Sequence, residues 1–253
     1  MNPLNLDDVR DYVNENIVDF HQRRIKSLDE LMLVKLLNKN PYLFKAKNIR
    51  SVSELIPSLL DAFLSSSEEK LFGDFLEGLA IFVASKTCGG HKSTASGVDL
   101  EFFNQEIHYI VSIKSGWNWG NSSQQRRLEE DLKNAVKRVK QSNRGANVQA
   151  VLGICYGKRK TSYLRGYLKV VGQNFWYLIS ESKHLYTDII EPIGYKARDH
   201  NQAFIDARGD AIDRLVHLCM DRFGDETGKI DWVKLVEFNS GNFDLDKFLP
   251  EKS

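Results

Sequence analysis

Three polar residues near the middle of the sequence have types and spacing that suit phosphodiester hydrolysis. Ser112 follows Asp99 by thirteen residues, and Lys114 lies two residues further on. An aspartate carboxylate is a hard oxygen ligand for Mg²⁺, and a bound Mg²⁺ lowers the pKa of its water. A neighbouring ammonium can orient the attacking water or stabilise charge on the phosphate. This chemistry requires a fold that brings the three side chains to one surface.

A β-hairpin is the element predicted to position them. Residues 97–103 and 106–114 each alternate polar and apolar side chains, as half-buried strands do. Asn104-Gln105 separates the two segments and is the predicted turn, which places Asp99 opposite Ile110. Directly paired residues, and residues two or four further along, point to the same face of a sheet. The aspartate, the serine and the lysine are therefore expected to share a face.

The two faces of this hairpin differ in polarity. One face carries the polar side chains, which are Asp99, Glu101, His108, Ser112 and Lys114. The other face is apolar apart from one hydroxyl and consists of Val98, Leu100, Phe102, Ile107, Tyr109, Val111 and Ile113. The apolar face is expected to be buried. The polar face should be reached by water, an ion or a ligand, because unpaired charges are costly to bury.

Helical periodicity dominates the sequence before the hairpin. Apolar residues recur every three or four positions through the N-terminal quarter of the chain, with a break at Asn40-Pro41 and a further helix over residues 53–65. A separate helix is predicted over residues 66–86, beginning at Ser66 or Ser67, because a serine hydroxyl can cap a helix N-terminus.

The remaining elements complete the predicted architecture. They are a helix over residues 122–141, strands over 149–156 and 163–171, and helices over 175–180 and 201–223. This order predicts an α/β (α+β) fold in which a mixed central sheet is flanked by helices. We expect residues 1–65 to form an N-terminal helical subdomain and residues 66–253 to form the core with the C-terminal helices.

Positive charge is concentrated in the middle of a chain whose formal net charge is only +1. Between Gly157 and Ser180 there is no acidic residue, and the cations there are Lys158, Arg159, Lys160, Arg165 and Lys169. The helix predicted over residues 122–141 adds further lysines and arginines. Such clusters are typical of surfaces that contact phosphates or guanines, and a solvated basic surface without a partner is the alternative.

An aromatic and amide-rich segment, Trp117-Asn118-Trp119-Gly120-Asn121, follows closely after Lys114. Asn118, Trp119 and Asn121 are candidates for contact with DNA. The alternative is that the tryptophan anchors packing, which is the commoner role of a large aromatic side chain.

Other features narrow the class of protein. The cysteines Cys88, Cys155 and Cys219 are far apart and lack CxxC spacing, so neither disulfides nor a zinc site is expected. No stretch approaches the roughly 20 apolar residues of a membrane span, and residues 1–20 are too acidic for a signal peptide. We therefore expect a cytoplasmic protein without a membrane partner.

Asp99 together with Ser112-Ile113-Lys114 resembles the PD-(D/E)XK nuclease core, in which an aspartate and a (D/E)-x-K element lie on the two arms of a hairpin. More narrowly, several segments are similar to a family of type II restriction endonucleases that cut GGNCC-centred palindromes. These segments are residues 71–77, 97–99, 111–116 and 153–157. The resemblance runs from the N-terminal helices to about Trp176.

This resemblance implies a restriction-endonuclease-like fold and a Mg²⁺-dependent enzyme that cuts double-stranded DNA at a short palindrome. It implies that Asp99 binds the metal, that the carbonyl of Ile113 is a further ligand, and that Lys114 is the catalytic lysine. Ser112 belongs to the same catalytic motif.

The sequence departs from the family pattern at two positions. Gly97-Val98-Asp99 replaces Pro-Asp, and Ser112 replaces the second acid. The second departure leaves the site short of a carboxylate. We expect Glu77, from the preceding helix, to supply it as a further catalytic and metal-binding residue, with Glu129 or Glu130 as the competing donor.

The resemblance also implies partners. A homodimer is expected, because two-fold symmetry in the protein would match that of a palindrome, with the N-terminal helices as the dimerisation or clamp element. A cognate DNA methyltransferase is expected in the same system. Two alternatives stay open: a repair or structure-specific nuclease of the same fold, and a non-catalytic DNA-binding module with a decayed site.

Overall fold

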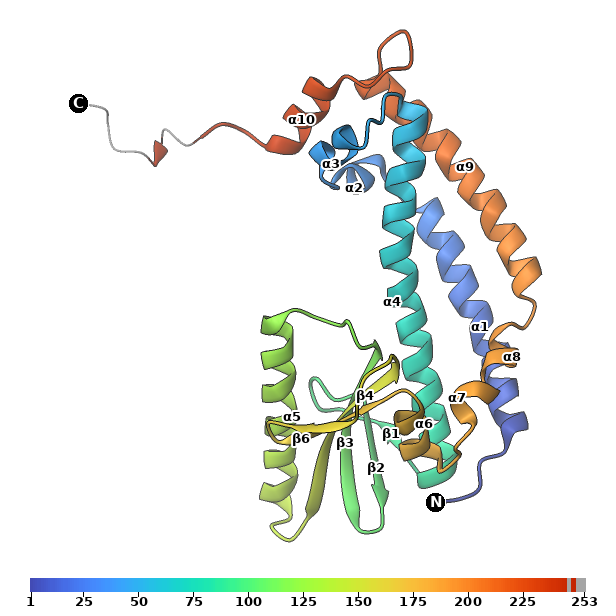
Figure 1. Cartoon of the computed structure of the whole chain (residues 1–253), viewed down its shortest axis with the longest axis vertical. Helices are drawn as coiled ribbons and strands as arrows, with labels where there is room; N and C mark the ends of the chain where they lie inside the picture. The colour runs from blue at the N-terminus through green and yellow to red at the C-terminus, as the bar shows by residue number, and fades with distance from the viewer. Residues whose placement is uncertain (245–246, 249–253) are drawn as a thin grey trace. The chain divides into compact units, whose positions relative to one another are not determined.

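The structure is a computed structural model, and it describes residues 1–244 and 247–248 (Figure 1). Its helices are α1 (Leu6–Asp29), α2 (Leu33–Leu37), α3 (Pro41–Ala46), α4 (Val52–Cys88), α5 (Ser122–Ser142), α6 (Gln173–Ser180), α7 (Leu185–Asp188), α8 (Ile190–Ile193), α9 (Ala197–Phe223) and α10 (Trp232–Ser240). Its strands are β1 (His91–Lys92), β2 (Leu100–Asn104), β3 (Ile107–Gly116), β4 (Asn147–Tyr156), β5 (Ser162–Leu164) and β6 (Tyr167–Val171).

The chain divides into two compact units. We call Met1–Gln22 with Glu69–His200 the sheet unit, and Arg23–Glu68 with the described residues from Asn201 onward the helical unit. This division does not coincide with the predicted boundary at residue 65. Residues 1–22 belong to the sheet unit although residues 23–68 do not, and the residues from Asn201 onward belong to the helical unit. Helical periodicity shows which face of a helix is buried, but not which distant segment buries it.

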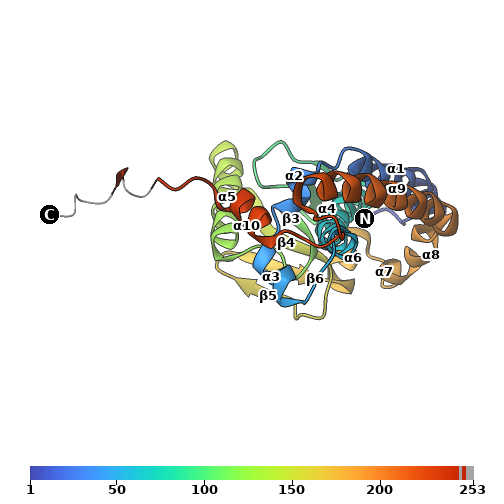
Figure 2. The same cartoon turned by 90° about the horizontal axis from the view of Figure 1, so that it is seen from above.

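The sheet unit is built on a mixed six-stranded sheet with the strand order β1-β2-β3-β4-β6-β5. β2 is antiparallel to β1 and β3, β4 is parallel to β3 and β6, and β5 is antiparallel to β6. Parallel strands require a crossover connection, which α5 supplies between β3 and β4. Seen from above, the strands lie between α5 and α6 (Figure 2). The predicted mixed sheet flanked by helices is confirmed.

The strand predicted over residues 163–171 is in fact two antiparallel strands. β5 and β6 are joined by a turn at Arg165 and Gly166, which have positive φ angles of 27° and 97°. Glycine tolerates such a conformation without steric cost, so the turn falls at Gly166.

The turn between β2 and β3 lies one residue later than predicted. Asn104 pairs with Ile107, and the turn residues Gln105 and Glu106 have φ angles of 47° and 64°. Two successive residues with positive φ match the twist of a two-residue hairpin. Neither residue is glycine or asparagine, which is why the sequence did not indicate this position for the turn.

Asp99 consequently lies opposite Ser112 and not opposite Ile110. Its N–H donates to the carbonyl of Val111 at 2.9 Å, and the next pair along the ladder is Leu100 with Val111. The correction moves the partner by two residues, and only a shift by an odd number of residues exchanges the faces of a strand. The predicted shared face therefore holds despite the wrong register.

Both faces of the sheet are packed against helices. One apolar cluster joins α4 and α6 to the strands and includes Leu79, Val83, Phe102, Val111 and Phe175. The other joins α5 to the opposite face and includes Leu128, Leu132, Ile110, Ala150 and Leu152. Asp99 and Lys114 on the polar face nevertheless keep partly exposed side chains.

Val98 was placed on the same face as Leu100, and this prediction is wrong as well. Val98 packs in the cluster under α5, whereas Leu100 packs in the cluster under α4. Strand alternation applies only within a strand, and β2 begins at Leu100.

α4 is one continuous helix, so the predicted helix start at Ser66 or Ser67 is wrong. The Ser66 hydroxyl donates to the carbonyl of Ala62 at 3.4 Å, four residues earlier. A serine inside a helix commonly makes this bond to the preceding turn, and it then has no capping role.

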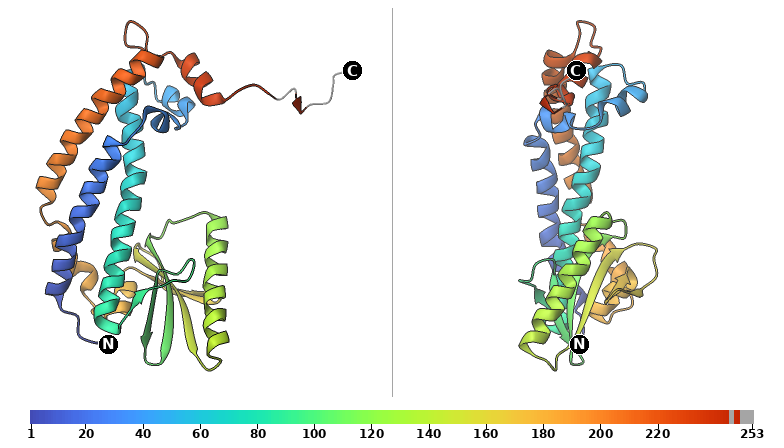
Figure 3. Two further views of the ribbon diagram at one scale, coloured as in Figure 1. Left: turned by 180° about the vertical axis from the view of Figure 1, so that it is seen from behind. Right: turned by 90° about the vertical axis from the view of Figure 1, so that its left-hand side faces the viewer.

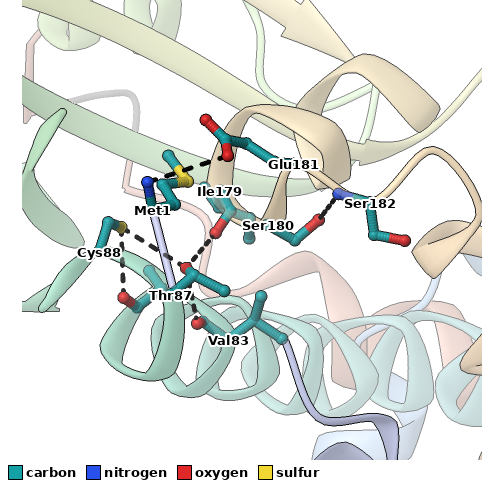
Figure 4. Close-up of polar contacts among 9 residues, drawn as sticks. Met1, Val83, Thr87, Cys88, Ile179, Ser180, Glu181 and Ser182 are labelled. Atoms are coloured by element: carbon teal, nitrogen blue, oxygen red, sulfur yellow. Dashed lines mark hydrogen bonds and ion pairs between the residues drawn. The ribbon is translucent and has the colours of Figure 1, made fainter. Parts of the chain in front are cut away.

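Polar contacts link the C-terminal end of α4 to α6 (Figure 4). The buried Thr87 hydroxyl lies 2.5 Å from the carbonyl oxygen of Ile179 and 3.0 Å from that of Val83. The thiol of Cys88 donates to the carbonyl of Ala84 at 3.2 Å. Buried polar groups need such partners, and these contacts fix the two helices that cover one face of the sheet.

The helical unit combines parts of α1, α4 and α9 with α2, α3 and α10 (Figure 3). Its core includes Leu28, Leu36, Leu60, Leu215 and Phe223. Arg214 of α9 donates to the carbonyls of Leu28 and Leu31 at 2.9 and 3.0 Å, which ties α9 to the end of α1. Within residues 1–244 and 247–248, no helix is both long enough and apolar enough to cross a bilayer.

Candidate active site

The structure brings Asp99, Ser112 and Lys114 together at the end of the hairpin. Oδ2 of Asp99 accepts hydrogen bonds from the N–H of Ile113 at 2.6 Å and from the hydroxyl of Ser112 at 3.2 Å. Nζ of Lys114 lies 3.8 Å from the same oxygen and donates to the carbonyl of Ile113 at 2.8 Å. A carboxylate and an ammonium therefore share one small surface.

Burial separates the roles of these side chains. Ser112 is buried, whereas the side chains of Asp99 and Lys114 keep 22% and 32% of their surface exposed. Ser112 orients the carboxylate with a neutral hydrogen bond and adds no charge. No hydrogen bond to Oδ1 of Asp99 is formed within the described part of the chain, so this oxygen is available to a ligand.

Glu77 of α4 lies close to this pair. Burial raises the pKa of Glu77, and the negative charge of Asp99 raises it further, while Lys92 and Lys114 lower it. Nζ of Lys92 lies 3.4 Å from Oε1 of Glu77. Lys92 belongs to the edge strand β1 and is largely exposed.

The oxygen atoms gathered here are suited to a hard divalent cation. Burial and, after it, the charge of Asp99 raise the pKa of Glu77, and a cation between the two carboxylates would offset both effects. In residues 1–244 and 247–248 there is no cluster of three or more histidine, cysteine, aspartate or glutamate side chains that could hold a metal. Mg²⁺ does not require one, because it is commonly bound through one or two carboxylates and keeps several waters. The donors Asp99, Glu77 and the carbonyl of Ile113 fit this pattern.

The competing donors on α5 are directed elsewhere. Glu129 pairs with Arg165, 3.7 Å from Nη1, and Glu130 is exposed on the outer face of the helix. The α5 acid that does approach the hairpin is Asp131, because a Cβ at Gly97 would collide with its carboxylate. The sequence pattern gave no reason to single out Asp131.

Two other polar residues of the same hairpin face form a separate network. Nε2 of the buried His108 lies 2.9 Å from Oε2 of Glu101, and the Ser93 hydroxyl donates to Oε1 of Glu101 at 2.5 Å. Both oxygens of Glu101 are engaged, so this network ties β1 to the hairpin and leaves the open end of the face to Asp99.

The segment that follows Lys114 has mixed roles. Trp119 packs in the cluster under α5, and Nζ of Lys114 lies 5.8 Å from the centre of its ring. Asn121 forms a capping box with Gln124 at the start of α5, in which its side chain accepts N–H bonds at 3.1 Å. Asn118 is exposed.

The basic turn after β4 borders a cavity of about 740 Å³. Lys158, Arg159 and Lys160 line its rim, and no acidic side chain contributes to its lining among the described residues. The guanidinium of Arg159 lies 4.0 Å from the ring centre of Trp117, which brings the turn to the segment that follows Lys114. Arg165 lines a different groove together with Glu129.

The mixed sheet flanked by helices and the carboxylate–lysine pair at the end of one hairpin are the features expected of a restriction-endonuclease-like fold. The family model of type II restriction endonuclease EcoO109I matches residues 7–201. Because this match spans well over half of the chain, the chain belongs to that family, which recognises a GGNCC-type site. No curated protein sequence matches the chain.

Proposed function

We propose that this chain is a Mg²⁺-dependent endonuclease that hydrolyses both strands of double-stranded DNA at a short, GGNCC-like palindrome. The observation that carries the proposal is the convergence of Asp99, Lys114 and Glu77 from three different elements. Nζ of Lys114 is 3.8 Å from Asp99, and Glu77 is close enough for the charge of Asp99 to raise its pKa. Membership in a family of restriction endonucleases supports the same chemistry.

Asp99 and Glu77 would hold the Mg²⁺, with the carbonyl of Ile113 as a further oxygen ligand. The bound ion supplies Lewis acidity toward the phosphate and lowers the pKa of its water. Ser112 and the N–H of Ile113 already hold Oδ2 of Asp99, so Oδ1 is presented without rearrangement of the side chain. Such preorganisation lowers the cost of binding.

Lys114 has the role of the catalytic lysine. Its ammonium lies between the carbonyl of Ile113 and the carboxylate of Asp99, at the edge of the donor set. From this position it can orient a water for attack or stabilise the negative charge that develops on the phosphate. Its partial exposure leaves it accessible to DNA.

DNA contacts are assigned to the exposed groups around the site. Lys158, Arg159 and Lys160 offer positive charge beside the hairpin, and Asn118 offers an amide. Trp119, Asn121 and Arg165 complete the proposed DNA surface. Each of these three already has a structural contact, in the α5 cluster, the capping box and the pair with Glu129 respectively.

The two-fold symmetry of a palindromic site also supports a proposal about the oligomeric state and partners of the protein. A palindrome is matched by a homodimer, and the helical unit is the element we assign to dimerisation or to clamping the DNA. A cytoplasmic location would give the enzyme access to DNA, and a cognate methyltransferase in the same system would protect the host genome from cleavage.

Digestion of plasmid DNA with Mg²⁺ tests the proposal. The wild-type protein should give discrete fragments, and Asp99→Asn and Lys114→Met should each abolish them. Glu106→Gln is the matched control, because Glu106 is exposed at the hairpin turn and should leave cleavage unchanged. A smear would indicate a repair or structure-specific nuclease. Fragments that persist in both site variants would contradict the assignment of the site.

A further inference from the structure

α5 carries a row of positively charged side chains that the proposed active site does not use. Lys133, Lys137, Lys140 and Arg144 recur at intervals of three or four residues and are exposed. Lys133, Lys137 and Lys140 lie on one side of α5, and Arg144 follows just after the end of the helix. Together the four residues line a single groove of about 830 Å³. We call these four residues the basic stripe.

The stripe lies away from the core side of α5. Leu128, Leu132 and Ala135 pack against the sheet, and none of them falls in the series that forms the stripe. Substitutions in the stripe therefore leave the packing of α5 intact.

The acids of α5 do little to neutralise the stripe. Glu129 pairs with Arg165, and Asp131 lies 4.0 Å from Arg127. Glu130 is the one carboxylate that lines the groove, against four cations. No ion pair involving the stripe residues is formed in the part of the chain that the structure describes. Positive charge near the C-terminal end of a helix is favoured by its dipole, but Lys133 and Lys137 lie too far inside α5 for this explanation.

The path of α5 leads away from the proposed site. Its first turn follows Trp119, whose ring lies near Lys114 at the end of β3. Its last turn leads into Asn147, which pairs with Ile107 at the opposite end of β3. The stripe thus extends toward the end of the sheet that is remote from Lys114.

We infer that the basic stripe binds the phosphate backbone of duplex DNA flanking the cleavage site, without reading its sequence. The inference rests on the proposed function, since it takes DNA as the ligand. At a rise of about 1.5 Å per residue, Lys133 to Lys140 spans roughly 10 Å, or about three base pairs of duplex, and Arg144 extends the row beyond the helix. Side chains at this spacing can follow one strand of phosphates, and they make no contact with base edges.

The salt dependence of DNA binding measures this contact. Affinity is measured by fluorescence anisotropy without divalent metal, so that no cleavage occurs, on duplexes of about 14 and about 40 base pairs that share one central sequence. Each lost phosphate contact lowers the slope of log K against log salt by about 0.9. The triple variant Lys133→Gln/Lys137→Gln/Lys140→Gln should therefore lower the slope by about 2.7 on the long duplex and leave it unchanged on the short one. Glutamine has a helix propensity close to that of lysine, so α5 should stay folded.

A matched control removes the same charge from another exposed surface of the sheet unit. Lys183→Gln/Lys196→Gln/Arg198→Gln should leave the slope on both duplexes unchanged. An unchanged slope for the stripe variant on the long duplex would overturn the inference, and so would an equal loss on both lengths. Failure of the proposed function would give a different result. A protein that binds both duplexes but does not cleave DNA with Mg²⁺ would contradict the proposed nuclease activity and leave the inference about the basic stripe standing.

Discussion

Lys92 forms an ion pair with Glu77, one of the proposed metal ligands, so its removal should strengthen metal binding. Its ammonium lies 3.4 Å from Oε1 of Glu77 and is one of the charges that lower the pKa of that carboxyl. A cation bound at Oε1 of Glu77 would have to displace this ammonium. Lys92→Met keeps the aliphatic part of the side chain and removes the competitor.

The size of the effect follows from the distance and the exposure. Two unit charges 3.4 Å apart in water interact by about 1.2 kcal/mol, which corresponds to about eightfold in affinity. The Lys92 side chain is 72% exposed, and exposed pairs are typically worth about 0.2–1 kcal/mol. The expected gain in Mg²⁺ or Mn²⁺ affinity is therefore about 1.4- to 5-fold.

Isothermal titration calorimetry with Mn²⁺ measures this gain directly. Lys183→Met, at an exposed position of the same unit, is the control and should bind the metal as the wild type does. In a Glu77→Gln background the effect of Lys92→Met should vanish, because the two residues then no longer interact. Equal or weaker metal binding by the Lys92 variant would refute the displacement argument.

Three further predictions concern the same unit. Glu77 keeps its proton to higher pH in the folded protein than in the unfolded chain, so without metal the folded state should lose stability as pH rises above the unfolded pKa. Glu77→Gln should remove this loss, which urea unfolding at a series of pH values measures. If the difference in unfolding free energy between wild type and variant did not change with pH, the raised pKa would be contradicted. Gly153→Ala should destabilise the sheet unit by about 1–3 kcal/mol in the same assay, because the added methyl group collides with the Phe175 ring; an unchanged midpoint would contradict the tight packing of α6 on β4. Arg159→Ala should weaken duplex binding and lower its salt slope by about 0.9, measured without divalent metal, and an unaltered slope would exclude a phosphate contact at this residue.

The shared face of the hairpin was predictable because the assignment of side chains to faces does not depend on the exact register. The alternation of residues 97–103 and 106–114 assigns faces by parity, and the actual turn at Gln105 and Glu106 moved the partner of Asp99 by two residues. Parity was unchanged, so the meeting of aspartate, serine and lysine could be derived without the correct turn.

Other parts of the site depend on contacts that a sequence pattern does not encode. Lys92 lies in a strand of two residues, too short to show any alternation. Asp131 approaches the hairpin only because Gly97 lacks a side chain at the point of contact. The burial of Ile110 under α5 also escaped prediction, since one strand period cannot show that both faces of a sheet are covered. The continuity of α4 was missed because serines favour helix caps yet are tolerated inside a helix.

The most direct test of the shared metal site is anomalous diffraction from crystals soaked in Mn²⁺. A peak at about 2.0–2.2 Å from Oδ1 of Asp99, with Glu77 turned toward it and away from Lys92, is the predicted result. A peak held by Glu129 or Glu130, or an occupied metal site that leaves Asp99 untouched, would contradict the account.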